Sequence, residues 1–284
     1  MNILIITPVK NESKFISKTI RSVIKQSVLP KKWLIVDDGS TDNTVDVINE
    51  LISNHDWIEL KLFKTKNEER TGGSKVVRAF NYGLSFVPVD DFDFIVKLDG
   101  DLELPENYFE KMINEFESDK KLGICGGTIY NKYSDNTIKI EKVSRFHVRG
   151  ALKMIKIECW RDINGFKEIW NWDGIDIMEA QYKGWNTRSI DTPVIHLRPT
   201  SSAYDPLQHA FKSGYESYKM GSDFFLTLIR AFFKIKTRPF FKCSYFYLKG
   251  YFNAGLKKEA LIVSPELASF INKKNYSRLN PFNQ

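Results

Sequence analysis

The sequence predicts an α/β protein with a doubly wound, mostly parallel sheet and a helical C-terminal extension rich in basic and aromatic residues. Three observations lead to this prediction. Apolar runs alternate with helical patterns in the first half of the chain, 42% of the 284 residues are apolar and can bury a large core, and the excess positive charge lies near the C-terminus. The composition shift near residue 220 predicts a domain over residues 1–220 and an extension over residues 221–284.

Four strand patterns are each followed by a helix pattern. The apolar spacing after each strand repeats every three or four residues, which is typical of a helix with one buried face. Strands rich in Ile, Val and Phe with helices between them predict a parallel sheet with right-handed crossovers. The expected strands are NILIITPV, WLIVDD, IELKLF and FDFIVKLD, and the expected helices cover 15–24, 45–52, 76–84 and 108–116.

Several classes of protein are not expected from the composition. The first strand begins at residue 3 without a basic segment or a cleavage site before it, so we expect a cytoplasmic protein. Three widely spaced cysteines argue against a disulfide framework or a zinc site. No apolar run has the roughly 18 residues of a spanning helix. We expect no nucleic acid among the partners.

The net charge of +7 belongs to one segment. Residues 224–258 contain eight Lys or Arg, eleven Phe or Tyr and no acidic residue. One interpretation is a helical subdomain packed on the core with solvated lysines. The other, which we favour because a patch built for solubility would mix charge signs, is peripheral attachment to an anionic membrane surface, on the inner face of the plasma membrane.

Polar clusters follow three of the expected strands: TPVKNE, DDGSTDN and DGD. In a doubly wound sheet, ligands bind at the carboxyl ends of the strands, where helix N-termini also point. In the second cluster Gly39 allows a tight turn, and Ser40 or Thr41 can cap the next helix. A remaining carboxylate, Asp37 or Asp38, can then accept a hydrogen bond from a ligand.

The third cluster places Asp99, Gly100 and Asp101 after a buried strand. Two carboxylates at this spacing can share one hard divalent cation, with water and phosphate oxygens completing its shell. Gly100 would let the backbone come close to that ligand. The alternative is a solvated turn centred on the glycine.

Together PVKNE, VDDGSTDNT and KLDGD resemble the family 2 inverting glycosyltransferases of the GT-A fold, which make bacterial surface polysaccharides. The resemblance covers roughly residues 1–200. In that family the first loop and the acidic pair after the second strand hold the nucleotide of a sugar-nucleotide donor, and the DxD motif carries ribose contacts and the metal. These roles would fall on Pro8, Val9 and Glu12 for the nucleotide, Asp38 for the base, Asp99 for the ribose and Asp101 for the metal.

Two further segments extend the resemblance on the donor side. ERTGGSKVVRAFNYGL matches the segment before the DxD strand, and it implies that Lys75 contacts the donor phosphates, whereas Arg78 fits a solvated helix face as well. SIDTPVIHLRPTSS predicts a strand that ends at His196. The family often has a late histidine that completes the metal shell, which would suit Mn²⁺ or Mg²⁺. Arg198 and Ser201 could reach the diphosphate.

The acceptor side is represented by WNWDGIDIMEAQYKGW, where Trp172 replaces the usual glutamate of a Glu-Asp pair. The resemblance makes Asp173 the candidate general base, because an inverting transfer needs a carboxylate to take the proton of the acceptor hydroxyl. Asp176 is the rival if the register shifts by one residue. Both could instead be acids that favour a helix N-terminus.

The resemblance implies an inverting, metal-dependent glycosyltransferase. Its donor would be a nucleoside-diphosphate sugar, with a UDP-sugar as first choice, and its acceptor a glycan or a lipid-linked sugar. Two alternatives share parts of the pattern. A nucleotidyltransferase that forms sugar nucleotides should have a glycine-rich first loop, which TPVKNE lacks. A receiver-like phosphate-binding module should end near residue 120 and would not need the later motifs.

Overall fold

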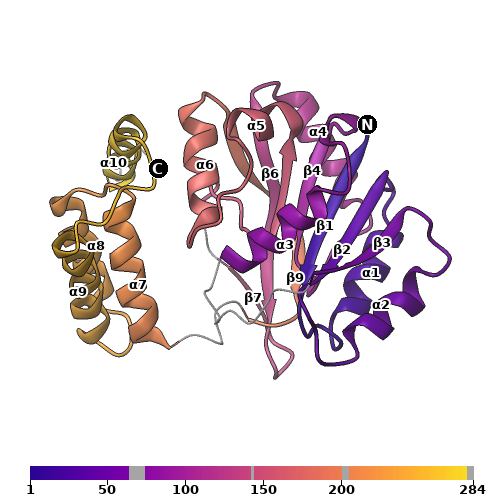
Figure 1. Cartoon of the computed structure of the whole chain (residues 1–284), viewed down its shortest axis with the longest axis horizontal. Coiled ribbons are helices and arrows are strands. Elements are labelled where there is room, and N and C mark those ends of the chain that lie inside the picture. The colour runs from indigo at the N-terminus through magenta and orange to yellow at the C-terminus, as the bar shows by residue number, and fades with distance from the viewer. Residues whose placement is uncertain (64–73, 142–143, 200–204, 280–284) are drawn as a thin grey trace. The chain divides into compact units, whose positions relative to one another are not determined.

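The computed structural model describes residues 1–63, 74–141, 144–199 and 205–279, and the chain forms two compact units, Met1–Thr200 and Ser201–Gln284 (Figure 1). The predicted boundary near residue 220 falls too late. Helix α7 (Pro206–Lys219) lies before the composition shift but packs along α9 (Lys242–Leu256), so it belongs to the second unit. No change in composition marks its start, and therefore the sequence did not reveal it.

The first unit is built on a mixed sheet of nine strands among the described residues. Eight of these strands follow one another as hydrogen-bonded neighbours. The ninth, the short β7 (Ile138–Ile140), pairs with β6 outside this order. The order from one edge is β3 (Ile58–Leu62), β2 (Lys32–Asp37), β1 (Ile3–Val9), β4 (Phe94–Leu98), β8 (Leu152–Lys156), β6 (Leu122–Lys132), β9 (Asn186–His196) and β5 (Leu102–Glu103).

The four predicted strands form one parallel half of the sheet. β1 pairs in parallel with β2 and β4, and β2 pairs in parallel with β3. The second half is mixed, because β8 runs antiparallel between β4 and β6, and β5 runs antiparallel to β9. This arrangement confirms the predicted α/β fold with a mostly parallel sheet, and it adds an antiparallel strand at the sheet centre.

Helices cover both faces of the sheet, because the central strands are buried on both sides. In β1, Ile3 and Ile5 belong to one apolar core while Leu4 and Ile6 belong to the other. Figure 1 shows the helices of the two cores on opposite sides of the sheet. The first core includes α1 (Ile16–Ile24), α2 (Thr44–Ile52) and α4 (Tyr108–Ser118), and the second includes α3 (Ser74–Leu84), α5 (Ile157–Asp162) and α6 (Trp172–Tyr182). A short 3₁₀ turn, η1, spans Val89–Asp91.

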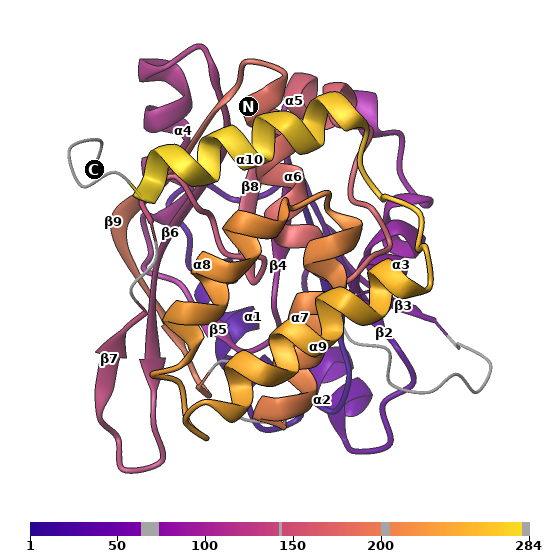
Figure 2. The same ribbon diagram turned by 90° about the vertical axis from the view of Figure 1, so that its left-hand side faces the viewer.

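The second unit contains α7, α8 (Phe224–Lys234), α9 and α10 (Pro265–Leu279), as Figure 2 shows. Asp205 and Asp223 cap α7 and α8, where their side chains accept hydrogen bonds from the first-turn amides of Leu207 and Leu226 at 3.0 and 2.8 Å. None of the helices in the described parts of the chain is long and apolar enough to cross a membrane.

Candidate active site

The loops after β1, β2 and β4 leave the sheet at the same edge. The register aligns Val9 with Asp37 and Ile6 with Lys97, so the polar clusters that follow these strands begin close together. The three predicted clusters therefore meet where a doubly wound sheet binds its ligands. Lys75 lies in the first turn of α3, which follows β3, and its side chain is partly exposed.

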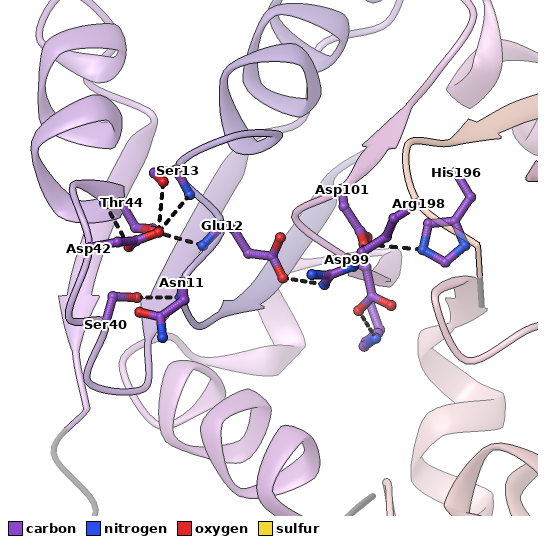
Figure 3. Close-up of polar contacts among 11 residues, drawn as sticks. Asn11, Glu12, Ser13, Ser40, Asp42, Thr44, Asp99, Asp101, His196 and Arg198 are labelled. Carbon is purple, nitrogen blue, oxygen red and sulfur yellow. Dashed lines mark hydrogen bonds and ion pairs between the residues drawn. The ribbon is translucent and has the colours of Figure 1, made fainter. Parts of the chain in front are cut away.

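Polar contacts fasten the loop after β1 to the loop after β2 (Figure 3). The backbone amide of Asn11 donates to Ser40 Oγ at 2.8 Å, and the amide of Glu12 donates to Thr44 Oγ1 at 2.8 Å. The prediction that Ser40 or Thr41 caps the next helix is wrong, because α2 begins at Thr44 with Asn43 before it. Ser40 instead donates its amide to Asp37 Oδ2 at 3.0 Å, so it shapes the turn that holds the two loops together.

Asp101, His196, Arg198 and Glu12 form one connected group (Figure 3). Pairing of β5 with β9 aligns Leu102 with His196, which brings His196 Nε2 to 3.1 Å from Asp101 Oδ2. Arg198 Nε lies 2.6 Å from the same oxygen, and its Nη2 pairs with Glu12 Oε1. Asp101 and His196, which the sequence assigns to one metal, are therefore in direct contact and buried.

Opposing charges control the ionisation of this group. Burial opposes the charged form of Asp101, but the hydrogen bond and charge of His196, with the charge of Arg198, lower its pKa. Burial also opposes a charged His196, but the bond to Asp101 raises its pKa. Burial and the charge of Asp101 raise the pKa of Glu12 to about 7, although Arg198 partly offsets them. Glu12 Oε2 is buried and has no hydrogen-bond partner among the described residues.

Asp99 and Gly100 form the turn that carries Asp101. The Asp99 carboxylate pairs with Lys97 Nζ, and its amide donates to the carbonyl of Ala151 at 2.9 Å. A Cβ on Gly100 would lie 2.8 Å from Val9 Cγ1, so only glycine lets this turn pack against β1. The close approach seen at Gly100 is to the protein itself, and its contact with a ligand stays a prediction.

The candidate base lies on the first turn of α6. Asp173 is partly exposed, whereas Asp176 is 2% exposed and faces the sheet. Lys153 Nζ donates to Asp176 Oδ1 at 2.6 Å and to the Asp173 carbonyl at 2.7 Å. Burial raises the pKa of Asp176 to about 6, even though Lys153 lowers it. Asp176 is thus committed to a buried lysine, and Asp173 keeps a carboxylate that solvent can reach.

Two buried lysines link the turn at Asp99–Asp101 with helix α6. Lys97 and Lys153 are direct partners across β4 and β8, and their ammonium groups lie 5.6 and 5.2 Å from the centre of the Trp172 ring. Lys97 pairs with Asp99 while Lys153 holds the start of α6. Neither lysine was predicted to belong to the site. The signal was available, because each lies between apolar residues within a strand, in FIVKL and LKMIK.

The donor set fits a divalent cation only in part. A carboxylate and an imidazole converge at Asp101 and His196, and these are suitable ligands for Mn²⁺ or Mg²⁺. Among the described residues there is no group of three or more His, Cys, Asp or Glu side chains that could hold a metal. These two residues therefore fit a cation that takes its other ligands from water and from a bound diphosphate. Ser201, a predicted diphosphate contact, lies outside the described residues.

Sequence comparison identifies relatives over the first unit. The model of the family described as Glycosyl transferase family 2 matches residues 4–185. Chondroitin synthase of Pasteurella multocida (strain Pm70) is 28% identical over 171 residues, which are 57% of this chain and 17% of that protein. Poly-beta-1,6-N-acetyl-D-glucosamine synthase of Staphylococcus aureus (strain COL) is 26% identical over 206 residues, 69% of this chain and 46% of that protein. The chain thus spans less than half of either relative.

Solved structures share the fold at low identity. TarS 1-349 of S. aureus, in complex with UDP-GlcNAc, has a TM-score of 0.54 at 16% identity and covers 98% of this chain and 80% of its own. Mannosyltransferase PcManGT of Pyrobaculum calidifontis, in complex with GDP-Man and Mn²⁺, has a TM-score of 0.54 at 16% identity, with 99% and 81% covered. Because the family match covers more than half of the sequence, the chain belongs to glycosyl transferase family 2, and its fold is the GT-A fold of such enzymes.

Proposed function

We propose that this protein is an inverting, metal-dependent glycosyltransferase of bacterial surface-polysaccharide synthesis. It moves a sugar from a nucleoside-diphosphate donor, with UDP-sugars as first candidates, to a hydroxyl of a glycan or lipid-linked acceptor. The observation that carries the proposal is the cluster of buried Asp101, His196 and Glu12 with the more exposed Arg198 at the carboxyl edge of a family 2 sheet. Relatives named as polysaccharide synthases, and a similar fold bound to UDP-GlcNAc, support the donor class.

On the donor side, the end of β1 and the loops after β1 and β2 provide the nucleotide pocket, with Pro8, Val9 and Glu12 lining it and Asp38 facing the base. The unpartnered Glu12 Oε2 supports this role, because a buried acceptor without a partner favours a ligand that donates to it. Asp99 and Gly100 meet the ribose, and Lys75 meets the phosphates.

The diphosphate leaves with growing negative charge, which the site must neutralise. A divalent cation held by Asp101 and His196 would supply positive charge that neutralises the leaving diphosphate. Arg198 contributes a second, permanent positive charge beside the same carboxylate. Most of the rate enhancement then comes from fixed charges that need no rearrangement during the reaction.

On the acceptor side, Asp173 takes the proton of the attacking hydroxyl. Its partial exposure and its place at the start of α6 support this assignment. Asp176 is better suited to hold Lys153, since that buried ammonium group donates to its carboxylate. Direct attack on C1 from the face opposite the diphosphate inverts the anomeric carbon, and no covalent sugar-enzyme intermediate is needed.

A donor screen tests the transferase proposal. The protein is incubated with a panel of UDP-, GDP- and dTDP-sugars with Mn²⁺, Mg²⁺ or a chelator, and nucleoside diphosphate release is measured. We expect metal-dependent release with one donor and a product of inverted anomeric configuration by NMR. In a parallel reaction with a nucleoside triphosphate and a sugar 1-phosphate, release of pyrophosphate would instead favour a nucleotidyltransferase, and inertness in both reactions would favour a phosphate-binding module.

Two substitutions test the site assignment within this assay. Asp173→Asn should leave donor affinity nearly unchanged and lower the transfer rate roughly 100-fold or more, because it removes the base alone. Asp101→Ala should abolish the gain in donor affinity that Mn²⁺ gives. If Asp173→Asn transfers at a near-normal rate, the base lies elsewhere, and a metal-dependent gain that survives in Asp101→Ala excludes this carboxylate as a ligand.

A further inference from the structure

The two central helices of the second unit expose large aromatic side chains. Phe225, Phe232 and Phe233 of α8 are 65%, 68% and 64% exposed. Phe241 and Tyr245, at the start of α9, are 69% and 62% exposed. Single exposed aromatic side chains are common on protein surfaces, but a cluster of them marks an interaction surface for another molecule or a membrane.

The exposed residues form one stripe along each helix. On α8, Phe225, Leu228 and Phe232 recur at helical spacing, while Leu226, Thr227 and Ala231 are buried on its other face. On α9, the exposed apolar side chains also form a stripe, and the opposite face of the helix packs against α7. The rings of Phe224 and Phe252, 6.0 Å apart, join the two stripes. The stripe on α9 consists of Phe241, Tyr245, Phe252 and Leu256.

The turn between α8 and α9 extends the same surface. Every residue from 236 to 242 is exposed, including Phe240 and Phe241. Phe241 has a φ of 60°, a left-handed conformation that is strained for a bulky aromatic residue. The turn therefore keeps a strained backbone although its two phenylalanine side chains are exposed and add nothing to the core. This favours a role for the turn in contacts with another molecule or surface.

Only positive charges accompany these rings. Residues 224–258 contain no acidic residue. The guanidinium of Arg238 lies 5.7 Å from the Phe240 ring and Lys249 Nζ lies 5.6 Å from the Phe246 ring, so charges and aromatic side chains are interleaved. The exposed basic residues are Lys236, Arg238, Lys242, Lys249, Lys257 and Lys258.

We propose that the exposed face of α8, the 235–241 turn and α9 is a docking surface for an anionic lipid bilayer. Aromatic and aliphatic side chains would enter the interface between headgroups and acyl chains, while lysines and arginines would meet the anionic headgroups. This surface includes no residue of the proposed donor site.

Other occupants fit the observations less well. A nucleic acid or an acidic glycan would neutralise the charge but leave the apolar side chains in water. A second copy of the chain would cover the rings but bring two all-positive faces together, which is repulsive. A bilayer of anionic lipid satisfies both the charge and the apolar surface.

Vesicle sedimentation with the full chain tests the proposal. Vesicles of phosphatidylcholine with about one third phosphatidylglycerol are compared with pure phosphatidylcholine vesicles. We expect binding to the anionic vesicles at low salt and release at roughly 0.5 M NaCl, where screening acts over a few ångströms. The combined Lys236→Gln, Arg238→Gln and Lys242→Gln variant should bind on the order of 100-fold more weakly, since each charge contributes about 1 kcal/mol, or about fivefold, at such a surface.

An aromatic variant and matched controls complete the design. Phe232→Ser with Phe240→Ser should weaken vesicle binding at least about tenfold, because the removed rings lose their buried area. The control changes, Lys120→Gln with Lys121→Gln and Phe86→Ser, remove exposed residues of the same kinds from the first unit and should leave binding unchanged. Circular dichroism and thermal unfolding establish that each variant is folded.

Four results would overturn the proposal. They are equal binding to neutral and anionic vesicles, no binding to either, unchanged binding in both the basic and the aromatic variants, and a concentration-dependent dimer that the same variants dissociate. Retention on a soluble polyanion that the aromatic variant does not weaken would assign the surface to nucleic acid or acidic glycan. No donor is present in the assay, so a failed donor screen leaves its outcome unaffected.

Discussion

Glu12 is a buried carboxyl group, and its ionisation destabilises the folded protein. Its pKa of about 7 in the folded protein compares with an ordinary value of 4.5, and burial is the main cause. Between these two values the folded chain binds a proton that the unfolded chain has released. The stability that this group contributes is therefore fully present below about pH 4.5 and is lost as the pH rises through about 7.

Glu12→Gln should remove this pH dependence, because the amide keeps the size of the side chain but cannot ionise. Relative to the unchanged protein, we expect the variant to gain up to about 3 kcal/mol between pH 5 and pH 8, from roughly 1.4 kcal/mol for each unit of pKa. Urea unfolding at several pH values measures the difference. A constant difference across this range would show that Glu12 titrates normally.

Lys153 and Asp176 form an ion pair within the apolar face of the sheet, where such pairs rarely stabilise more than apolar side chains would. Because Lys153 also donates to the carbonyl of Asp173, its contribution can lie in the position of that residue. Measurements of both stability and activity distinguish a purely structural role of this ion pair from a role in positioning Asp173.

Lys153→Met alone should destabilise the protein by about 3 to 5 kcal/mol, because Asp176 would be left buried without its partner. The double variant Lys153→Met with Asp176→Leu should recover most of the stability yet still transfer at least about tenfold more slowly, with an unchanged KM for the donor. Lys156→Met, on the same strand, is the control. Normal turnover in the stable double variant would leave the pair with a structural role only.

At the scale of elements, the close contact between α7 and α9 is made at a glycine of each helix. A Cβ on Gly214 would lie 1.8 Å from the carbonyl oxygen of Tyr247, and a Cβ on Gly250 would lie 2.0 Å from that of Phe211. No side-chain movement relieves such a contact, because both neighbours are backbone atoms. The two helices therefore pack closely only without side chains at these positions.

Gly214→Ala should destabilise the second unit by about 3 kcal/mol or more, although alanine favours an isolated helix by about 1 kcal/mol over glycine. The control is Gly255→Ala on α9, where the nearest atom is in the movable ring of Tyr218 at 3.3 Å. Thermal unfolding and limited proteolysis measure both. A neutral or stabilising Gly214→Ala would mean that the helices lie further apart.

Local patterns predicted the elements of the first unit better than their pairing. Apolar runs and helical spacing identified β1 to β4 and the helices after them, since each pattern is a property of a short segment. The antiparallel β8 at the sheet centre was not predicted, because LKMIK is compatible with either strand direction. Helix α7 has no distinctive composition, and its membership in the second unit depends on the contact with α9.

At the scale of the whole molecule, the sequence motifs predicted which loops meet but not how their side chains pair. Asp101 and His196 are 95 residues apart, and a long β9 with the short β5 brings them together. The sequence assigned Arg198 to the diphosphate, whereas here it pairs with Asp101 and Glu12. Such pairings depend on distances set by the complete sheet, and no single segment contains them.

The two units make different demands on one reaction when the acceptor is carried on a lipid. The first unit would bind the sugar-nucleotide donor, while the proposed bilayer surface of the second would keep the protein in the same thin layer as the acceptor. Confinement of both partners raises their effective concentration without any new contact at the active site. The benefit should therefore disappear when the acceptor is soluble.

The variant with Lys236→Gln, Arg238→Gln and Lys242→Gln should lose at least about tenfold in transfer to a lipid-linked acceptor in anionic vesicles, and nothing in transfer to a soluble acceptor with the same sugar. Rates are compared at low and high salt, because screening should lower the rate of the unchanged protein to that of the variant. The double change Lys120→Gln and Lys121→Gln, which removes two exposed positive charges from the first unit, is the control for a loss of charge elsewhere. An equal loss with both acceptors would place these basic residues in the catalytic step rather than at the membrane, since attachment to a surface cannot affect an acceptor that is free in solution.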